Sequence, residues 1–192
     1  MFAFAYHDAS SGTTYLCRDR YGIKPLVYAP HRSGIAFASE VKALMAIGEV
    51  RADRLQSLLA LRTLGDKSVS RTMFTNVTQV PPGTLVSLRD GRVVETVDYD
   101  SLLSHVDEAR HRDILGRGFE GACDELRELL EGAVERMAAC DARLGTFLSG
   151  GIDSSLVTAI GVAQEHPDFR AFTSDVVGDG SESVHAEDTA RA

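Results

Sequence analysis

The chain has 192 residues, of which 44% are hydrophobic and 25% charged, as is typical of a globular protein with a packed core. Its 20 basic and 28 acidic residues give a formal net charge of −8, which argues against nucleic acid or an anionic membrane as the main partner. No apolar run approaches the roughly 18 residues of a membrane span and no charged-then-apolar leader opens the sequence, so we expect a soluble, cytoplasmic protein.

Short strands separated by turns occupy the beginning of the chain. Apolar and β-branched residues over 1–6 and 13–18 flank a turn-rich connection, which predicts a hairpin. Two further strands are predicted over 26–29 and 35–38, and a short helix over 40–47 follows them. We expect these four strands to form one antiparallel sheet.

The next region continues this mixed pattern. Leucines at helical spacing predict a second helix over 53–64. Strands are then predicted over 77–80, 84–88 and 93–97, because Pro-Gly and Asp-Gly turns separate these runs. The charged stretch 99–118 has few bulky apolar residues, and we expect it to be a linker. The region before it therefore has the pattern of an α+β domain with an antiparallel sheet.

The last part of the chain alternates helices and strands. Residues 119–139 predict an amphipathic helix whose apolar face packs in a core. A strand over 144–148, a helix over 154–164 and a strand over 169–174 predict a βαβ unit with parallel strands. A weaker helical pattern begins at 183. This order is typical of an α/β domain.

Three cysteines, Cys17, Cys123 and Cys140, lie far apart in the sequence. An odd, sparse set without a CxxC pair or a companion histidine pattern argues against a disulfide framework and against a zinc site. For Cys17 in its strand and Cys123 in its helix, we expect small buried thiols.

A small-residue turn, Ser149-Gly150-Gly151-Ile152-Asp153-Ser154, joins the strand over 144–148 to the helix after it. Such a turn lets backbone N–H groups approach an anion without obstruction from a Cβ atom. The helix N-terminus adds unpaired N–H donors and the positive end of a dipole. Together these features predict a phosphate-binding loop. The alternative is an ordinary strand-to-helix turn with a Ser or Asp N-cap.

The run S-G-G-x-D-S resembles the PP-loop of the ATP pyrophosphatases, enzymes that cleave ATP to AMP and pyrophosphate. It lacks the lysine and the longer glycine spacing of a Walker A loop, which argues against a kinase or GTPase. A second run, R-D-R-Y-G-I-K-P-L over 18–26, is followed by F-A-S-E-V-K-A-L. This block resembles the second half of the glutamine amidotransferase domain of asparagine synthetases, where it precedes a PP-loop synthetase domain in the same order.

The resemblance implies a place for the charged block over 18–26. In asparagine synthetases it would contribute to the interface between the two active sites, without taking part in bond-breaking. The residues alone leave another interpretation open, namely a solvated loop with weak local ion pairs.

The resemblance also implies a division of the chain. Residues 1–98 would be the end of an α+β amidotransferase domain of the N-terminal-nucleophile type, 99–118 a linker, and 119–192 the start of an α/β, parallel-sheet PP-loop ATP pyrophosphatase domain. Family members carry a catalytic N-terminal Cys and a glutamine-binding Asn-Gly-Glu run, and Met1 aligns past both. We therefore expect a fragment that spans the domain junction, holds no glutaminase nucleophile and is inactive alone.

By the same resemblance, the parent protein would be a glutamine-dependent amide ligase that makes asparagine from aspartate. Its partners would be ATP with Mg²⁺, glutamine, and aspartate or another carboxylate, and a homodimer is compatible with the family. An acyl-adenylate would form as pyrophosphate leaves. Two alternatives stay open: another superfamily member, such as a β-lactam synthetase or lasso-peptide cyclase, and a non-catalytic nucleotide-binding remnant.

The resemblance assigns ATP and pyrophosphate binding to Leu148, Ser149, Gly150, Gly151, Ile152, Asp153 and Ser154. The two serine hydroxyls and the N–H groups of 150–152 would stabilise the charge on pyrophosphate. Asp153 would hold Mg²⁺, the alternative being an N-cap. Leu148 would abut the nucleoside, and Thr173 and Ser174 would lie on the adenine side. Relatives usually carry Ile/Val-Gly-Phe where Ser174-Asp175-Val176 stands.

Overall fold

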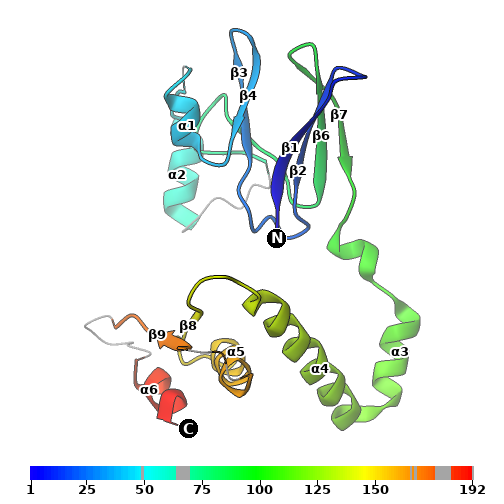
Figure 1. Ribbon diagram of the computed structural model, residues 1–192, viewed down its shortest axis with the longest axis vertical. Helices are drawn as coiled ribbons and strands as arrows, with labels where there is room; N and C mark the ends of the chain where they lie inside the picture. Colours follow the sequence, from blue (N-terminus) through cyan, green and yellow to red (C-terminus); the bar gives the residue numbers. More distant parts are fainter. Residues whose placement is uncertain (49, 64–69, 165, 167, 176–182, 192) are drawn as a thin grey trace. The chain divides into compact units, whose positions relative to one another are not determined.

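The computed structural model describes residues 1–192 except 49, 64–69, 165, 167, 176–182 and 192. The chain divides into two compact units, Met1–Val106 and Asp107–Ala192 (Figure 1). The division falls within the predicted linker over 99–118. The bounds of the two predicted domains and of the linker stay a prediction.

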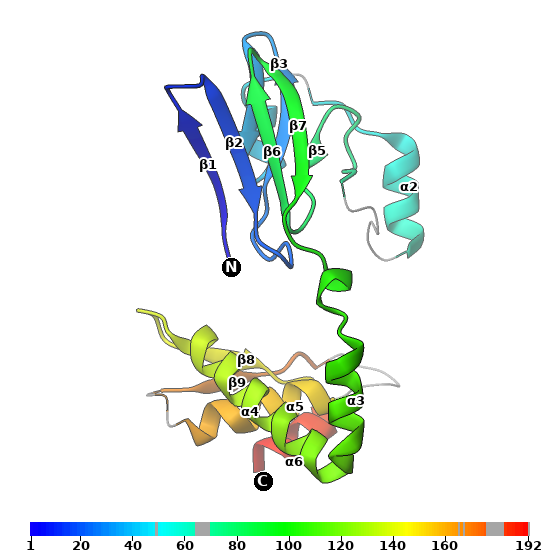
Figure 2. The ribbon, with the colours of Figure 1, turned by 90° about the vertical axis from the view of Figure 1, so that its right-hand side faces the viewer.

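The first unit contains a four-stranded antiparallel sheet (Figure 2). Strand β1 pairs with β2 in the register Ala3↔Arg18, which confirms the predicted hairpin. Cys17 in β2 is 6% exposed, so the expected burial of this thiol is also confirmed. In spatial order, the strands are β1 (Ala3–Asp8), β2 (Thr13–Arg18), β6 (Thr84–Arg89) and β7 (Arg92–Asp98).

A second sheet of the first unit has the order β4-β3-β5, with β3 (Val27–His31), β4 (Gly34–Ala38) and β5 (Thr78–Gln79). The expectation that the first four strands form one sheet is therefore wrong. Strand β2 uses its second edge to pair with β6, and the loop over 19–26 carries the chain into the other sheet. Both sheets thereby bury apolar side chains in one cluster of Leu16, Leu26, Val80, Val86 and Leu88.

Both predicted helices of the first unit are present. Helix α1 (Val41–Met45), shorter than expected, buries Leu44 in a cluster with Val27, Ala29 and Val77. Helix α2 covers Arg54–Thr63, and the predicted last residue, Leu64, lies outside the described residues. Its leucines stand at the surface, since Leu55, Leu58 and Leu61 are 63%, 64% and 78% exposed. The unit is thus an α+β antiparallel-sheet domain.

Part of the predicted linker is helical. A 3-10 helix, η1 (Leu102–His105), ends the first unit, and helix α3 (Glu108–Gly116) begins the second. The Asp107 carboxylate caps α3 by accepting hydrogen bonds from the N–H groups of Ala109 and Arg110. Helix α4 (Gly118–Ala138) follows, and its Glu125 pairs with Arg110 and Arg117.

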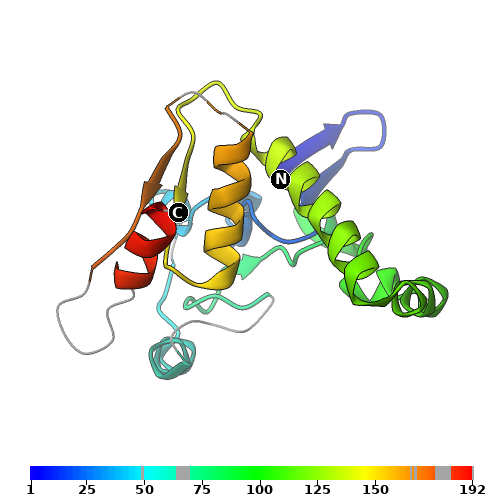
Figure 3. The same ribbon diagram turned by 90° about the horizontal axis from the view of Figure 1, so that it is seen from below.

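The second unit contains the predicted βαβ arrangement (Figure 3). Strands β8 (Gly145–Phe147) and β9 (Arg170–Phe172) pair in parallel, which confirms the expected strand direction, and α5 (Ile152–Ala163) connects them. Helix α6 (Ser183–Arg191) ends the described chain. The core role expected for α4 holds only in part, because Phe119, Leu126 and Met137 are 85%, 54% and 57% exposed. Cys123 is half-buried and Cys140 exposed, both as free thiols.

Candidate functional site

The predicted phosphate loop lies at the carboxyl end of β8, where residues 148–151 lead into α5. Gly151 is the N-cap of α5, with φ −73° and ψ 160°, and no side chain caps this helix end. The first turn of a helix leaves N–H groups without an intrahelical partner. The absence of a side-chain cap at Gly151 leaves these donors available to an anion at the turn.

Two serines connect the ends of this turn. The Ser149 N–H donates to Ser154 Oγ at 3.2 Å, and the two hydroxyl oxygens lie 3.0 Å apart. Ser154 Oγ lies 3.1 Å from the Gly151 carbonyl oxygen, to which it can donate. These contacts are exposed and stay within the turn. They bring both hydroxyls to the side of the turn where the helix begins, so the two hydroxyls can be redirected to a ligand.

The flanking residues differ in burial. Leu148 is 3% exposed, and its N–H donates to the Phe172 carbonyl at 2.8 Å, so this residue is buried at the carboxyl end of β8. Ile152 is 86% exposed. Asp153 stands exposed in the first turn of α5 and has no hydrogen bond or ion pair among the described residues. The alternative of an Asp153 N-cap is wrong, because Gly151 occupies that position.

Thr173 and Ser174 follow β9 and are exposed. Because β8 and β9 are parallel and Phe147 pairs with Phe172, their carboxyl ends share one edge of the strand pair. The structure therefore brings Thr173 and Ser174 to the edge from which the Ser149 turn emerges. This is the edge at which ligands bind in open α/β sheets.

The charged loop over 18–26 belongs to the first unit and is built differently. The Arg18 side chain is buried, and its guanidinium donates to three backbone carbonyl oxygens. These are Lys24 O at 2.8 Å, Val80 O at 2.8 Å and Gly22 O at 2.7 Å. The interpretation of a solvated loop is therefore wrong for Arg18, whereas Arg20 and Lys24 of the same loop are exposed.

Asp19 is the second buried charge of this loop, and its sign is opposite to that of Arg18. Its buried carboxylate accepts hydrogen bonds from four backbone N–H groups. Burial by itself would raise the pKa of this carboxyl, but the four donors outweigh burial and lower the pKa to about 2. The donors are those of Lys24 at 2.9 Å, Ile23 at 3.0 Å, Phe2 at 3.2 Å and Tyr21 at 3.2 Å. Arg18 and Asp19 thus close the loop through the backbone.

The end of the first unit is tied to the same loop. The Tyr99 hydroxyl donates to the Arg18 carbonyl oxygen at 2.7 Å. Asp100 Oδ2 lies 2.5 Å from Arg20 Nε, and Asp100 Oδ1 lies 2.7 Å from His105 Nε2. The hydrogen bond from His105 and the nearby Arg20 lower the pKa of the Asp100 carboxyl. The charged block and Tyr99-Asp100, which are far apart in the sequence, therefore form one structural cluster.

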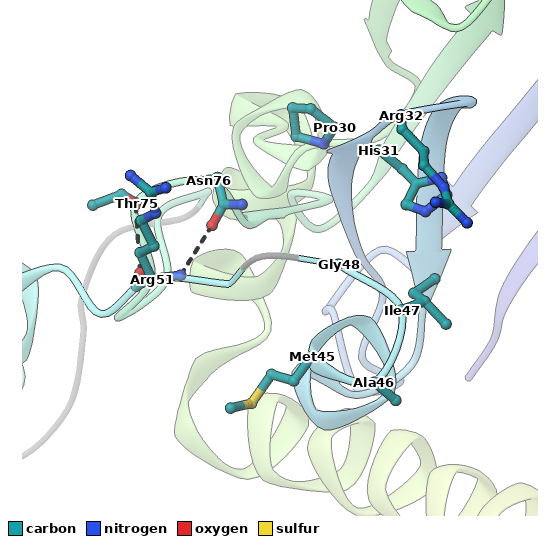
Figure 4. Close-up of a pocket in the computed structure, with 10 residues that line it drawn as sticks. All are labelled: Pro30, His31, Arg32, Met45, Ala46, Ile47, Gly48, Arg51, Thr75 and Asn76. Carbon is teal, nitrogen blue, oxygen red and sulfur yellow. Dashed lines mark hydrogen bonds between the residues drawn. The ribbon is translucent and has the colours of Figure 1, made fainter.

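A hollow of about 870 Å³ in the first unit contains none of the predicted site residues (Figure 4). The β3–β4 turn contributes His31 and Arg32 to its wall. On its other side the Arg51 N–H donates to Asn76 Oδ1 at 3.4 Å, and the Thr75 N–H donates to the Arg51 carbonyl at 2.9 Å. The sequence gives no motif for this hollow, because its lining comes from three separate segments.

Among the described residues, no three His, Cys, Asp or Glu side chains gather as a ready-made metal site. Within the same part of the chain, no helix is long and apolar enough to cross a membrane.

Comparison with known proteins matches the two halves to two family models. Residues 1–99 match the glutamine amidotransferase domain, and residues 125–192 match asparagine synthase. Over 175 residues the chain is 31% identical to the glutamine-hydrolyzing asparagine synthetase 3 of Bacillus subtilis (strain 168), covering 89% of this chain and 27% of that protein. Asparagine synthetase 1 of the same strain is 30% identical over 198 residues, covering 100% of this chain and 29% of that protein.

A relative with a different name is also similar. Amidase chyE of Penicillium rubens is 35% identical over 167 residues, covering 83% of this chain and 23% of that protein. The chain spans less than a third of the length of each of these relatives.

Proposed function

The chain belongs to the asparagine synthetase family, and from that membership we propose that its protein is an ATP-dependent and glutamine-dependent amide ligase. The reaction forms asparagine. The aspartate side-chain carboxylate attacks the α-phosphorus of ATP and pyrophosphate leaves, giving an acyl-adenylate. Ammonia released from glutamine then attacks the acyl carbon, and AMP leaves with the former carboxylate oxygen.

The observation that carries this proposal is the exposed turn at Ser149–Ser154 within the region that matches asparagine synthase. It follows a parallel strand, opens a helix without a side-chain cap and holds two hydroxyls within 3.0 Å of each other. In the same chain, the amidotransferase match over 1–99 precedes it. A phosphate loop alone would fit many enzymes, whereas the two matches in this order support a ligase that draws ammonia from glutamine.

In the proposed mechanism, the turn stabilises the charge of the departing pyrophosphate. The N–H groups of Gly150, Gly151 and Ile152 and the hydroxyls of Ser149 and Ser154 bind its oxygens. The backbone N–H groups stabilise a transition state because fixed donors need little rearrangement as charge develops, whereas the two hydroxyls turn toward the ligand. Leu148 abuts the nucleoside, and Thr173 and Ser174 approach adenine from the end of β9.

Asp153 is the proposed contact for Mg²⁺. Its exposed carboxylate has no partner among the described residues and stands in the first turn of α5. One carboxylate suits Mg²⁺, which keeps several waters and takes further oxygens from substrate phosphates. When bound, the ion neutralises phosphate charge. Asp153 would hold the triphosphate in register with the turn.

Residues 1–192 are proposed to bind ATP. We also propose a division into domains over 1–98 and 119–192, joined by a linker over 99–118. The second domain is the beginning of a PP-loop ATP pyrophosphatase domain. The complete reaction is proposed for a protein as long as the relatives. A cytoplasmic location and a homodimer stay predictions.

A second candidate stays open because a relative at 35% identity has a name other than asparagine synthetase. This candidate is a ligase of the same superfamily that acts on a carboxylate other than that of aspartate. The candidates differ in the acceptor and share the turn. A panel of carboxylates supplied with ATP, glutamine and the full-length protein distinguishes them, because only the true acceptor yields an amide together with AMP.

Titration calorimetry of this chain with Mg-ATP tests the shared step. We expect saturable binding that depends on Mg²⁺, that pyrophosphate competes for, and that Asp153→Asn weakens. Absence of binding at millimolar Mg-ATP to the folded chain would contradict the proposed site.

A further inference from the structure

Helix α6 packs directly on the phosphate turn, although the two are separated by more than 30 positions in the sequence. Gly150 has φ +83°, a left-handed conformation that favours glycine. A Cβ atom built on it would lie 2.6 Å from both the Ala186 nitrogen and His185 Cβ. Ala186 is 1% exposed, so α6 packs against the loop at this residue (Figures 1 and 3).

A chain of hydrogen bonds runs from α5 to the same contact. The Thr189 hydroxyl donates to the His185 carbonyl at 3.0 Å, and Thr189 Oγ1 lies 3.1 Å from Ser155 Oγ. A hydroxyl has one proton. Because Thr189 gives its proton to His185, Ser155 is the donor to Thr189. The order is therefore Ser155 to Thr189 to His185, and His185 contacts Gly150.

This chain differs from the hydrogen bonds inside the turn. Ser149 and Ser154 must redirect their hydroxyls to bind phosphate, which breaks their mutual contact. The bond between Ser155 and Thr189 uses no group proposed to bind phosphate. It can therefore persist when ATP is bound and hold the turn in the same geometry with and without the ligand, which lowers the ordering cost of binding.

We propose that Thr189 is a positioning residue for the phosphate turn. Its hydrogen bond to Ser155 fixes α6 to α5, and its hydrogen bond to the His185 carbonyl, within α6, orients the Thr189 hydroxyl for that contact. This inference rests on the proposed ATP-binding function. Thr189 does not touch the nucleotide. It keeps the N–H groups of 150–152 pointing at one place by holding the wall against which Gly150 packs.

The test compares Thr189→Val, which keeps the branched shape but removes the hydroxyl, with Thr189→Ser, which keeps the hydroxyl. Calorimetry with Mg-ATP and with Mg-pyrophosphate gives the dissociation constants for each folded chain. We expect Thr189→Val to weaken both ligands about three- to tenfold, the range for one lost hydrogen bond, and Thr189→Ser to bind like the wild type. If the affinities for the two ligands fall equally, the lost interaction concerns the phosphate groups, which both ligands share.

The outcomes separate the two claims. If the wild-type chain binds neither ligand, the proposed function fails and this inference with it. If the wild type binds and the folded Thr189→Val chain binds equally well, only the inference is overturned. It is also overturned if Thr189→Ser loses as much affinity as Thr189→Val, because shape rather than the hydroxyl would then matter. If Thr189→Val does not fold, Ser155→Ala removes the same bond from α5, and unchanged affinity there overturns the inference.

Discussion

The two motifs that identify the family are built in opposite ways. In the loop over 18–26, Arg18 and Asp19 are 5% and 4% exposed, and both side chains form hydrogen bonds with backbone groups of the first unit. In the turn over 149–154, the hydrogen bonds are exposed and stay within the turn, and Asp153 has no partner among the described residues. The first motif closes a loop, whereas the second leaves donors and a carboxylate available.

A charged structural motif and a binding motif make different demands on burial. A buried charge costs several kcal/mol unless hydrogen bonds compensate it, so Arg18 and Asp19 have to be fully partnered. An anion site needs exposed hydrogen-bond donors, which bind water until the ligand replaces it. Changes in the first motif should therefore affect mainly stability, and changes in the second mainly ligand binding.

The largest effect is expected from Asp19→Ala. It removes the acceptor of four backbone N–H groups and leaves the Arg18 charge beside an apolar core, at a cost on the order of 3 kcal/mol in the free energy of unfolding. Chemical denaturation measures this cost. The matched control is Asp8→Ala, because the Asp8 carboxylate accepts bonds from Ser10 and Ser11 in an exposed turn. Equal, small losses for both variants would contradict a special role for the buried loop.

A smaller but more local effect is expected from Gly150→Ala. A left-handed backbone costs a residue with a Cβ atom about 1–2 kcal/mol, and the new methyl group would overlap Ala186 and His185. We expect at least about tenfold weaker binding of Mg-ATP. Gly151→Ala is the control for stability, since its Cβ would meet only Ser149 Oγ at 3.5 Å. The unfolding temperature should fall for Gly150→Ala and stay nearly constant for Gly151→Ala, and the reverse order would refute the packing of α6 on the turn.

The buried loop should also make stability depend on acid pH. The pKa of Asp19 is lowered from 3.8 to about 2 in the folded protein, so the unfolded chain binds a proton more readily. The stability that Asp19 contributes is present above pH 4 and is lost as the pH falls from about 4 to about 2. Thermal unfolding of the wild type and of Asp19→Asn across this range checks it. An equally steep loss in both proteins would show that other carboxyls account for the dependence.

The smallest effect is expected from Arg20→Ala. Arg20 pairs with Asp100 at 2.5 Å, but its side chain is 50% exposed, unlike that of neighbouring Arg18. The Asp100 side chain is 8% exposed but keeps its contact with His105 Nε2, and the exposed half of the pair contributes little, so the unfolding temperature should change by no more than a few degrees. A loss as large as that of Asp19→Ala would mean that the Arg20–Asp100–His105 cluster, and not Arg18 with Asp19, holds the loop.

Local patterns in the sequence predicted most strands and the turn of the phosphate loop, but not how the strands assemble. The hairpin of β1 and β2 follows from residues near in sequence, whereas the separation of β2 from β3 into two sheets does not. That separation depends on contacts such as Arg18 to Val80, 62 positions apart. No periodicity in the sequence encodes such a pair.

The same limit applies to the candidate site. The strand, the small residues and the helix after them predicted the turn, because these features are adjacent in sequence. The sequence also left open an N-cap role for Asp153, which the structure assigns to Gly151. The contact of α6 with Gly150 was missed, because Thr189 and His185 lie in a weak helical pattern that carries no motif.

Hydrogen exchange of the turn is the most direct test of the central claim that residues 149–154 bind the phosphates of ATP. The exchange rates of the backbone amides of Gly150, Gly151 and Ile152 are measured with and without Mg-pyrophosphate. We expect slower exchange of these amides on binding, while the amides of the loop over 18–26 stay unchanged. Unchanged exchange at Gly150, Gly151 and Ile152 with millimolar Mg-pyrophosphate would contradict this claim.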